Sequence, residues 1–157
     1  MLPGDIPRLQ LVMEHEAGTP FHLAWRPSVP VDDSVVGTLA VSYSDATVRL
    51  MDIPNLPEND VASSRVRATA RTSLHVPGTA CYSLAWGGPT RLAVGCSNGH
   101  VAIWELNGNE EAPAPLVDAP LHDTLVSSLA WQMLPPLSVD GIPWHEGHPD
   151  VLCSVGW

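Results

Sequence analysis

The chain has 157 residues, of which 45% are hydrophobic, and it contains 16 Pro, 12 Gly and six Trp. This length and apolar fraction suit one folded domain and exclude a disordered polar tail. Seventeen acidic residues against seven basic ones give a formal net charge of −10, which repels phosphate and excludes non-specific binding to nucleic acid or to an acidic membrane.

The first twenty residues carry charged side chains among the apolar ones, so no signal-peptide core is visible. No apolar run approaches the roughly 18 residues that span a bilayer. We therefore expect a soluble, intracellular protein without a membrane partner.

The three cysteines are far apart in the sequence, and each lies in an apolar stretch: Cys81, Cys96 and Cys153. There is no Cys-x-x-Cys motif and no disulfide framework. We expect all three to be buried free thiols.

A five-residue pattern ending in Trp occurs three times, as FHLAW at 21–25, YSLAW at 82–86 and SSLAW at 127–131. A histidine precedes each Trp by nine to eleven residues, at His15, His75 and His122. Because a repeated unit at this spacing is typical of propellers and solenoids, the strands are expected to build the fold while loops of unequal length decorate one face.

In chain order, each unit is predicted to contain a strand before its histidine, the LAW strand, a second apolar strand, a tight turn and a third strand. The first unit covers 8–53, with its turn at Asp45-Ala46. A Pro-rich connector at 54–70 leads into the second unit at 71–106, with its turn at Asn98-Gly99. The third unit, at 115–157, is truncated, because Trp157 aligns with the residue just before the turn in the other two.

Four-stranded units of this kind resemble the blades of the WD-repeat β-propeller family. Trp104-Glu105 stands where the family has its Trp-Asp pair, and Met51-Asp52 holds the same place one unit earlier. Asp45 and Asn98 match the residue in the turn that, in the family, bonds toward the histidine of the blade. The resemblance implies a structural hydrogen-bond network within the blades that draws on His15, Asp45, Asp52, His75, Asn98, Trp104 and His122.

The expected fold is therefore all-β, a partial WD-repeat β-propeller of about two and a half four-stranded antiparallel blades. Propellers usually need at least four blades to close. We expect a fragment, a mispredicted gene product, or a half-ring completed by another chain, with an open strand edge at its end.

Two patterns point to chemistry, and we weigh each against a simpler interpretation. Gly95-Cys96-Ser97-Asn98-Gly99 fits the nucleophile elbow of serine hydrolases, but the motif must enter a helix, and here a strand follows. His145-Glu146-Gly147-His148 places two histidines in a Pro-flanked loop, without the helical spacing of a zinc site. We therefore predict no catalytic residue, no metal, no cofactor and no small-molecule substrate, with a hydrolase using Ser97 as a remote alternative.

Four residues are candidates for partner contact. Arg65, Arg67 and Arg71 form a basic cluster that could touch phosphate or an acidic partner, although a solvated connector is the simpler interpretation. Trp144, in the long loop of the third unit, is a candidate exposed anchor.

The order and residue pattern of three blades resemble those of the WD-repeat subunits of TFIIIC, the general RNA polymerase III transcription factor. The relevant segments are GTLAVSYSDATVRLMDIPNLPE, CYSLAWGGPTRLAVGCSNGHVAIWEL and LHDTLVSSLAW. The resemblance implies a nuclear scaffold that acts in tRNA gene transcription and binds other protein subunits, with at most indirect contact to DNA.

An alternative is a generic WD-repeat adaptor, such as a ubiquitin-ligase substrate receptor, which would also allow a cytoplasmic location. Such receptors often carry Trp-Asp-x-Arg at the end of a blade. Two places after the acid, where the motif has its Arg, this chain has Pro54 (after Asp52) and Asn107 (after Glu105), which counts against this function.

Overall fold

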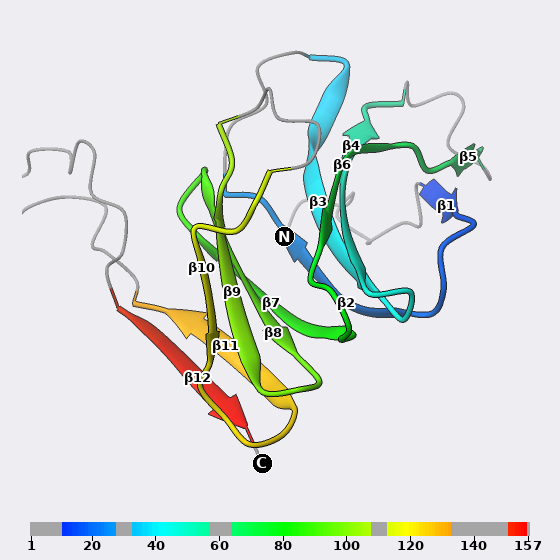
Figure 1. The fold of residues 1–157 in the computed structure, drawn as a ribbon. Coiled ribbons are helices and arrows are strands. Elements are labelled where there is room, and N and C mark those ends of the chain that lie inside the picture. Colours follow the sequence, from blue (N-terminus) through cyan, green and yellow to red (C-terminus); the bar gives the residue numbers. More distant parts are fainter. Residues whose placement is uncertain (1–10, 28–32, 57–63, 108–112, 133–150, 157) are drawn as a thin grey trace, which may run out of the picture.

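The computed structural model describes residues 11–27, 33–56, 64–107, 113–132 and 151–156, and these segments contain strands but no helix (Figure 1). No helix long and apolar enough to cross a membrane is therefore found in them. The strands are β1 (Leu11–Glu14), β2 (Pro20–Trp25), β3 (Val35–Tyr43), β4 (Thr47–Pro54), β5 (Ser64–Arg67), β6 (Ala70–His75), β7 (Cys81–Gly87), β8 (Arg91–Cys96), β9 (His100–Glu105), β10 (Val117–Pro120), β11 (Val126–Trp131) and β12 (Leu152–Gly156).

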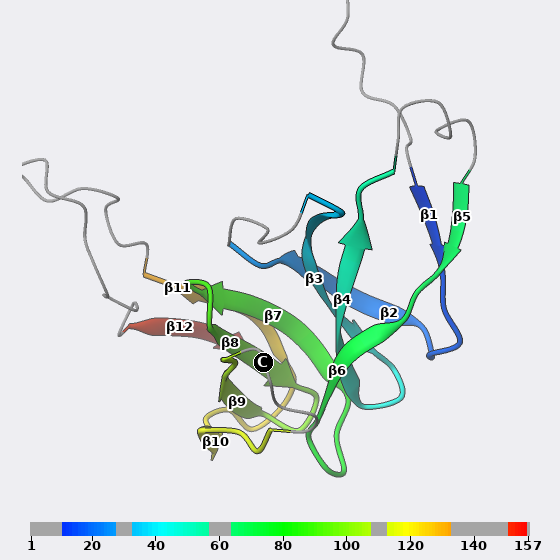
Figure 2. The same cartoon turned by 90° about the horizontal axis from the view of Figure 1, so that it is seen from above.

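Most strands belong to antiparallel sheets that follow one another in a row (Figures 1 and 2). Blade 1 has the order β2-β3-β4-β6, and blade 2 has the order β7-β8-β9-β10. Strands β11 and β12 form a two-stranded half-blade. This architecture confirms the expected all-β fold, a partial β-propeller of two four-stranded antiparallel blades and part of a third.

The LAW repeat has the same pairing register in all three sheets. Its Ala lies opposite a small residue each time, in the pairs Ala24–Ala40, Ala85–Ala93 and Ala130–Cys153. Its Trp lies opposite a Leu each time, in the pairs Trp25–Leu39, Trp86–Leu92 and Trp131–Leu152. Since side chains alternate along a strand, each inner strand has a Trp face, which carries its Leu and Trp, and an Ala face on the opposite side.

The blade boundaries differ from those expected. Strand β6 pairs with β4, and β10 pairs with β9, so the strand before each histidine completes the preceding blade rather than opening the next one. Strand β1 pairs in parallel with β5 in a separate two-stranded ribbon. Apolar alternation identifies a strand but does not say which neighbour it pairs with, so the predicted units at 8–53, 71–106 and 115–157 are each shifted by one strand.

The hydrophobic core lies between successive sheets. One cluster joins the Ala face of blade 1 to the Trp face of blade 2 and contains Ala24, Ala40, Leu84, Trp86 and the fully buried Trp104. A second joins blade 2 to the half-blade through Ala93, Val101, Val126 and Leu129. A third lies between blade 1 and the β1–β5 ribbon.

The cysteine prediction is correct for two of the three residues. Cys81 and Cys96 are buried free thiols, whereas Cys153 is a free thiol exposed on β12. The alternation along β12 places Cys153 on the Ala face of the half-blade, and no described sheet covers that face. A hydrogen bond shared with Cys81, together with burial, raises the pKa of Cys96 and keeps this thiol protonated.

Candidate functional site

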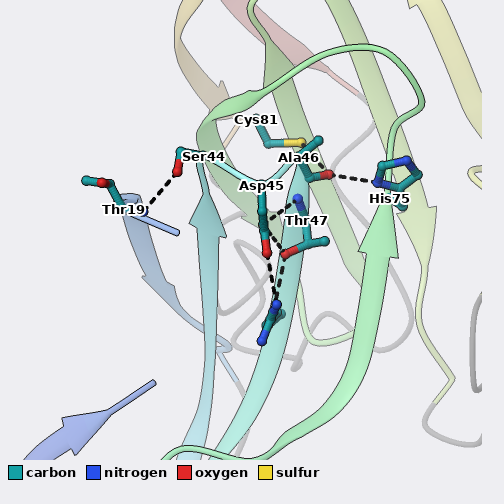
Figure 3. Close-up of polar contacts among 8 residues, drawn as sticks. Thr19, Ser44, Asp45, Ala46, Thr47, His75 and Cys81 are labelled. Carbon is teal, nitrogen blue, oxygen red and sulfur yellow. Dashed lines mark hydrogen bonds and ion pairs between the residues drawn. The ribbon is translucent and has the colours of Figure 1, made fainter. Parts of the chain in front are cut away.

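The turn between β3 and β4 joins two of the predicted network residues to their surroundings (Figure 3). The carboxylate of Asp45 accepts hydrogen bonds from the backbone N–H of Thr47 (3.1 Å) and from its hydroxyl (2.6 Å). Arg49 lies 2.9 Å from the other carboxylate oxygen. The carbonyl of Ala46 lies 3.1 Å from Nδ1 of His75, so this histidine connects the turn to the end of β6.

The charge of Asp45 is stabilised by this arrangement. Partial burial alone would raise the pKa of the carboxyl group, but the two bonds from Thr47 and the charge of Arg49 outweigh it, and the pKa falls below its ordinary value. Asp45 therefore carries a negative charge at neutral pH, held within its own turn.

The equivalent turn of blade 2 has the same construction. Asn98 accepts a bond from the N–H of His100 (3.3 Å), as Asp45 does from Thr47. The following residues, Ala46 and Gly99, both have left-handed backbones, with φ of 67° and 83°. Asn98 thus fills the structural place of the acid, and no bond from its side chain to a histidine side chain is seen in the described part of the chain.

Ser97 has a structural role that repeats in blade 1. The hydroxyl of Ser97 accepts a bond from the backbone N–H of Ala80 (3.2 Å) and lies 3.0 Å from the hydroxyl of Thr79. In blade 1, the hydroxyl of Ser44 accepts a bond from the N–H of Thr19 (2.9 Å) in the same way. Strand β9 begins three residues after Ser97, so the motif enters a hairpin and not the helix that a nucleophile elbow requires.

The three repeat histidines have different surroundings. His75 bonds to the β3–β4 turn as described above, and Nε2 of His122 lies 2.8 Å from the hydroxyl of Ser154 in the half-blade. His15 is exposed, and its ring lies 4.9 Å from that of Tyr43 in a tilted arrangement.

The acids at the ends of β4 and β9 also have equivalent partners. Asp52 accepts a bond from the hydroxyl of Thr38 (2.7 Å) and lies 3.3 Å from Arg71. Glu105 accepts a bond from Thr90 and lies 3.0 Å from Arg91. Each acid therefore fastens the third strand of its blade to the second.

Trp104 lies apart from these polar groups. It is fully buried, and its indole donates a bond of 3.0 Å to the carbonyl of Pro113. Among the described contacts, Asp45 and His75 lie at the same β3–β4 turn, and the other residues expected in a blade network make separate local contacts.

The basic cluster is neutralised by acidic neighbours. Arg65 lies 2.7 Å from Glu14 across the β1–β5 ribbon, Arg67 contacts Glu16, and Arg71 pairs with Asp52. None of these three guanidinium groups presents an uncompensated positive charge to a phosphate. The pairs of Arg65 and Arg67 are largely exposed, so they contribute little to stability.

The seams between blades carry polar contacts that the sequence alone did not indicate. The indole of Trp86 donates to the carbonyl of Ala24 (3.1 Å), and the indole of Trp131 donates to the carbonyl of Ala85 (3.0 Å). The LAW tryptophans of blade 2 and of the half-blade thus each bond to the LAW alanine of the preceding blade. The spacing of LAW repeats gives the signal for this contact, but its direction requires the stacking of the sheets.

Arg26 was also missed. It donates to the carbonyls of Pro89 and Leu106 and lies over the ring of Trp86, 5.6 Å from the centroid. Burial, and then the nearby charge of Arg71, lower the pKa of Arg26. The only sequence signal is its place directly after the LAW strand of blade 1.

Trp144 and the His145-Glu146-Gly147-His148 loop lie outside the described residues. Among the described residues, no group of three or more His, Cys, Asp or Glu side chains lies close enough to hold a metal ion. In the part of the chain that the structure describes, a depression of about 410 Å³ is lined by Pro120 at the end of β10 and by the three residues that follow it, Leu121, His122 and Asp123, so the described lining comes from one short stretch of chain.

No family model matches this chain, but a curated protein is similar to it. The chain is 27% identical over 140 residues to transcription factor tau subunit sfc6 of Schizosaccharomyces pombe. This match covers 86% of the present chain. The chain resembles a transcription factor tau subunit. It spans 22% of the length of that relative.

Two solved structures are also similar. A humanized mutant of the Chaetomium thermophilum Polycomb Repressive Complex 2 has a TM-score of 0.47 and 16% identity, over 71% of this chain and 24% of the other. The mitotic checkpoint complex has a TM-score of 0.42 and 19% identity, over 85% of this chain and 37% of the other.

Proposed function

We propose that this chain is part of a non-catalytic WD-repeat scaffold in a TFIIIC-type factor, acting in RNA polymerase III transcription of tRNA genes in the nucleus. The observation that carries the proposal is the similarity to the transcription factor tau subunit, which extends over 86% of the chain. The blade architecture supports a rigid platform, because its strands and turns are held by contacts internal to the blades.

The charges support protein subunits as the direct partners. The net charge of −10 repels DNA phosphates, and Arg65, Arg67 and Arg71 are each paired with a carboxylate. DNA contact through the described surface is therefore at most indirect, with other subunits binding the promoter.

Neither alternative gains support from a contact. Ser97 bonds to the backbone and to a threonine, with no base beside it among its described contacts. Asp52 is engaged with Thr38 and Arg71 inside blade 1, so it is not presented as part of a ligase-binding motif.

The test is affinity purification of the tagged natural protein from nuclear extract, followed by mass spectrometry. We expect TFIIIC subunits to be enriched and tRNA genes to be recovered in a parallel chromatin immunoprecipitation. A variant with Trp104→Ala, which removes the largest fully buried side chain, is the unfolded control and should lose both signals. Enrichment of cullin-ligase adaptors without TFIIIC subunits would overturn the assignment.

A further inference from the structure

Blade 2 carries two buried thiols that face each other across its inner strand pair. Cys81, the first residue of β7, is the register partner of Cys96, the last residue of β8. Both side chains are fully buried, and both are free thiols in the hydrophobic cluster between blades 1 and 2. The proposed scaffold function requires neither thiol.

A β-bulge places the two thiols on the same face of the sheet. Cys81 lies three residues before Leu84, so plain alternation along β7 would direct these two side chains to opposite faces. The register shifts between Cys81 and Ser83, and the extra residue brings Cys81 into the cluster that contains Leu84 and Cys96. The equivalent positions of blade 1 and of the half-blade hold the pairs Pro20–Tyr43 and Val126–Gly156. The fold therefore does not require cysteine at this pair.

The backbone at this pair has the spacing that suits a disulfide. Just beyond the two cysteines, the backbone N–H of Ser97 donates to the carbonyl of Ala80 (2.9 Å). The carbonyl of Cys96 accepts from Gly99 (3.3 Å), so it points toward the turn before β9 and not toward β7. The cysteines therefore form a non-hydrogen-bonded pair, in which antiparallel strands bring their side chains closest. The usual Cα separation of such a pair, about 4.5 Å, lies within the range of about 4.4–6.8 Å that disulfides span.

The hydrogen bonds of the two thiols give them different reactivity. The sulfur of Cys81 lies 4.0 Å from the carbonyl oxygen of Ala46, to which its S–H donates across the seam, and it accepts a bond from the thiol of Cys96 (Figure 3). The bond from Cys96 lowers the pKa of Cys81, whereas the same bond and burial raise the pKa of Cys96. Since the thiolate is the reactive form, Cys81 is the more nucleophilic of the two.

We propose that Cys81 and Cys96 form a reversible dithiol–disulfide switch, which joins β7 to β8 covalently when the protein meets hydrogen peroxide. Both thiols are 0% exposed, which favours this small oxidant over a bulky disulfide. The switch is independent of the proposed scaffold function.

The reaction has two steps. The thiolate of Cys81 attacks one peroxide oxygen, so an S–O bond forms, the O–O bond breaks, and the released hydroxide takes up the proton that Cys81 lost. The sulfur of Cys96 then attacks the sulfenic sulfur of Cys81, so the S–S bond forms, the S–O bond breaks, and the thiol proton of Cys96 leaves with the hydroxide as water. Two thiols and one peroxide thus give one disulfide and two waters. A dithiol reductant reverses the change by thiol–disulfide exchange and is itself oxidised to a disulfide.

Oxidation changes two contacts in the structure. The disulfide closes residues 81–96 into a covalent loop, which restricts the unfolded chain. It also removes the S–H that Cys81 donates to Ala46, so that, of the contacts described for this carbonyl, the one with Nδ1 of His75 is left. The oxidised protein therefore has a more stable blade 2 and one bond fewer across the seam to blade 1.

The test is oxidation of a folded Cys153→Ser variant, which leaves Cys81 and Cys96 as the two thiols of the chain. Cys153 is exposed, so this substitution leaves the buried cluster intact. After hydrogen peroxide has been added and then removed with catalase, the intact mass is measured, and the denatured chain is labelled with a maleimide. We expect the loss of two hydrogen atoms, no added oxygen, and a loss of labelling that dithiothreitol restores. Added oxygen, or thiols that still label, would overturn the proposal.

Two variants in the same background separate the roles of the thiols. With Cys96→Ala, the reaction stops at the sulfenic acid, so dimedone should label Cys81. With Cys81→Ala, dimedone should label Cys96 at least about tenfold less, because that thiol has the raised pKa. Urea unfolding establishes beforehand that each variant is folded, since both substitutions lie in the core. Equal labelling of the two folded variants would contradict Cys81 as the attacking thiol.

The urea midpoint of the Cys153→Ser variant before and after oxidation tests the structural effect. We expect the midpoint to rise on oxidation and to return after dithiothreitol, because the closed loop restricts the unfolded chain. An oxidised chain that unfolds at the same or a lower urea concentration would show that the bond strains the sheet, and the proposed link between β7 and β8 would then be wrong.

Discussion

Glycine 99 offers the sharpest test of the turn geometry, through the substitution Gly99→Ala. Its φ is 83°, and a Cβ added there would lie 1.8 Å from the carbonyl oxygen of His122 and 2.6 Å from the carbonyl carbon. The left-handed backbone alone costs an alanine about 1–2 kcal/mol. The contact forces the 121–122 segment away, which weakens the two bonds of 3.1 Å that Leu121 and His122 donate to the Gly99 carbonyl, at about 1 kcal/mol each. We expect a total loss of about 3–4 kcal/mol of unfolding free energy.

The matched control is Gly78→Ala. Gly78 has a φ of 73°, but a Cβ added there meets nothing within 4 Å, so this variant measures the backbone cost alone. Urea unfolding followed by tryptophan fluorescence should place Gly99→Ala below Gly78→Ala by about 2 kcal/mol. If the two variants unfold at the same midpoint with equal slopes, the close approach of His122 to Gly99 is wrong.

Four further predictions concern stability. Ala46→Gly should raise the unfolding free energy by about 1 kcal/mol in the same urea assay, because Ala46 holds a φ of 67° in the place of Gly99; no gain would contradict the strained turn. Trp86→Phe should lose about 1–2 kcal/mol, since an aromatic ring is kept but the indole bond to Ala24 is lost. Phe21→Leu removes no hydrogen bond and should lose less, and equal losses would argue against the seam bond. Because the pKa of Asp45 is lowered on folding, its charge stabilises the protein above about pH 4, and this contribution is lost as pH falls. The difference in urea midpoint between wild type and Asp45→Asn should therefore be larger at about pH 7 than at about pH 2.5. The opposite trend would refute a lowered pKa of Asp45. Arg65→Gln should change the unfolding free energy by less than about 0.5 kcal/mol, as expected for an exposed pair with Glu14, and a larger loss would mean that the ribbon depends on that contact.

The strands could be predicted from the sequence with good accuracy, because β-branched and apolar residues alternate between turn residues over most of the chain. The LAW repeat also predicted three equivalent inner strands, and the structure gives them one shared register. The pairing of β6 and β10 could not be predicted, since the alternation of a strand is the same whichever sheet it joins. The parallel β1–β5 pair joins segments about fifty residues apart, and no local pattern encodes that contact.

The contacts of the candidate site were harder to predict than its residues. The sequence identified Asp45, Asn98 and His75 as turn and network residues, and the structure places each at a turn contact. It did not show that Arg65 and Arg67 face Glu14 and Glu16, because these pairs depend on the ribbon. The indole bonds across the seams were missed for a similar reason, since a repeated residue does not reveal which neighbour it contacts.

The completion of each blade by the strand before the next histidine has a consequence for folding during synthesis. Three strands of blade 1 are available once residue 54 has been made, but its outer strand β6 ends only at His75. Blade 2 likewise waits for β10, which ends at Pro120. During synthesis, each new segment therefore adds the outer strand of the preceding blade before it forms the strands of its own blade. A nascent chain halted at residue 106 would hold one complete four-stranded blade and a second blade without its outer strand, in which Trp104 cannot yet bond to Pro113.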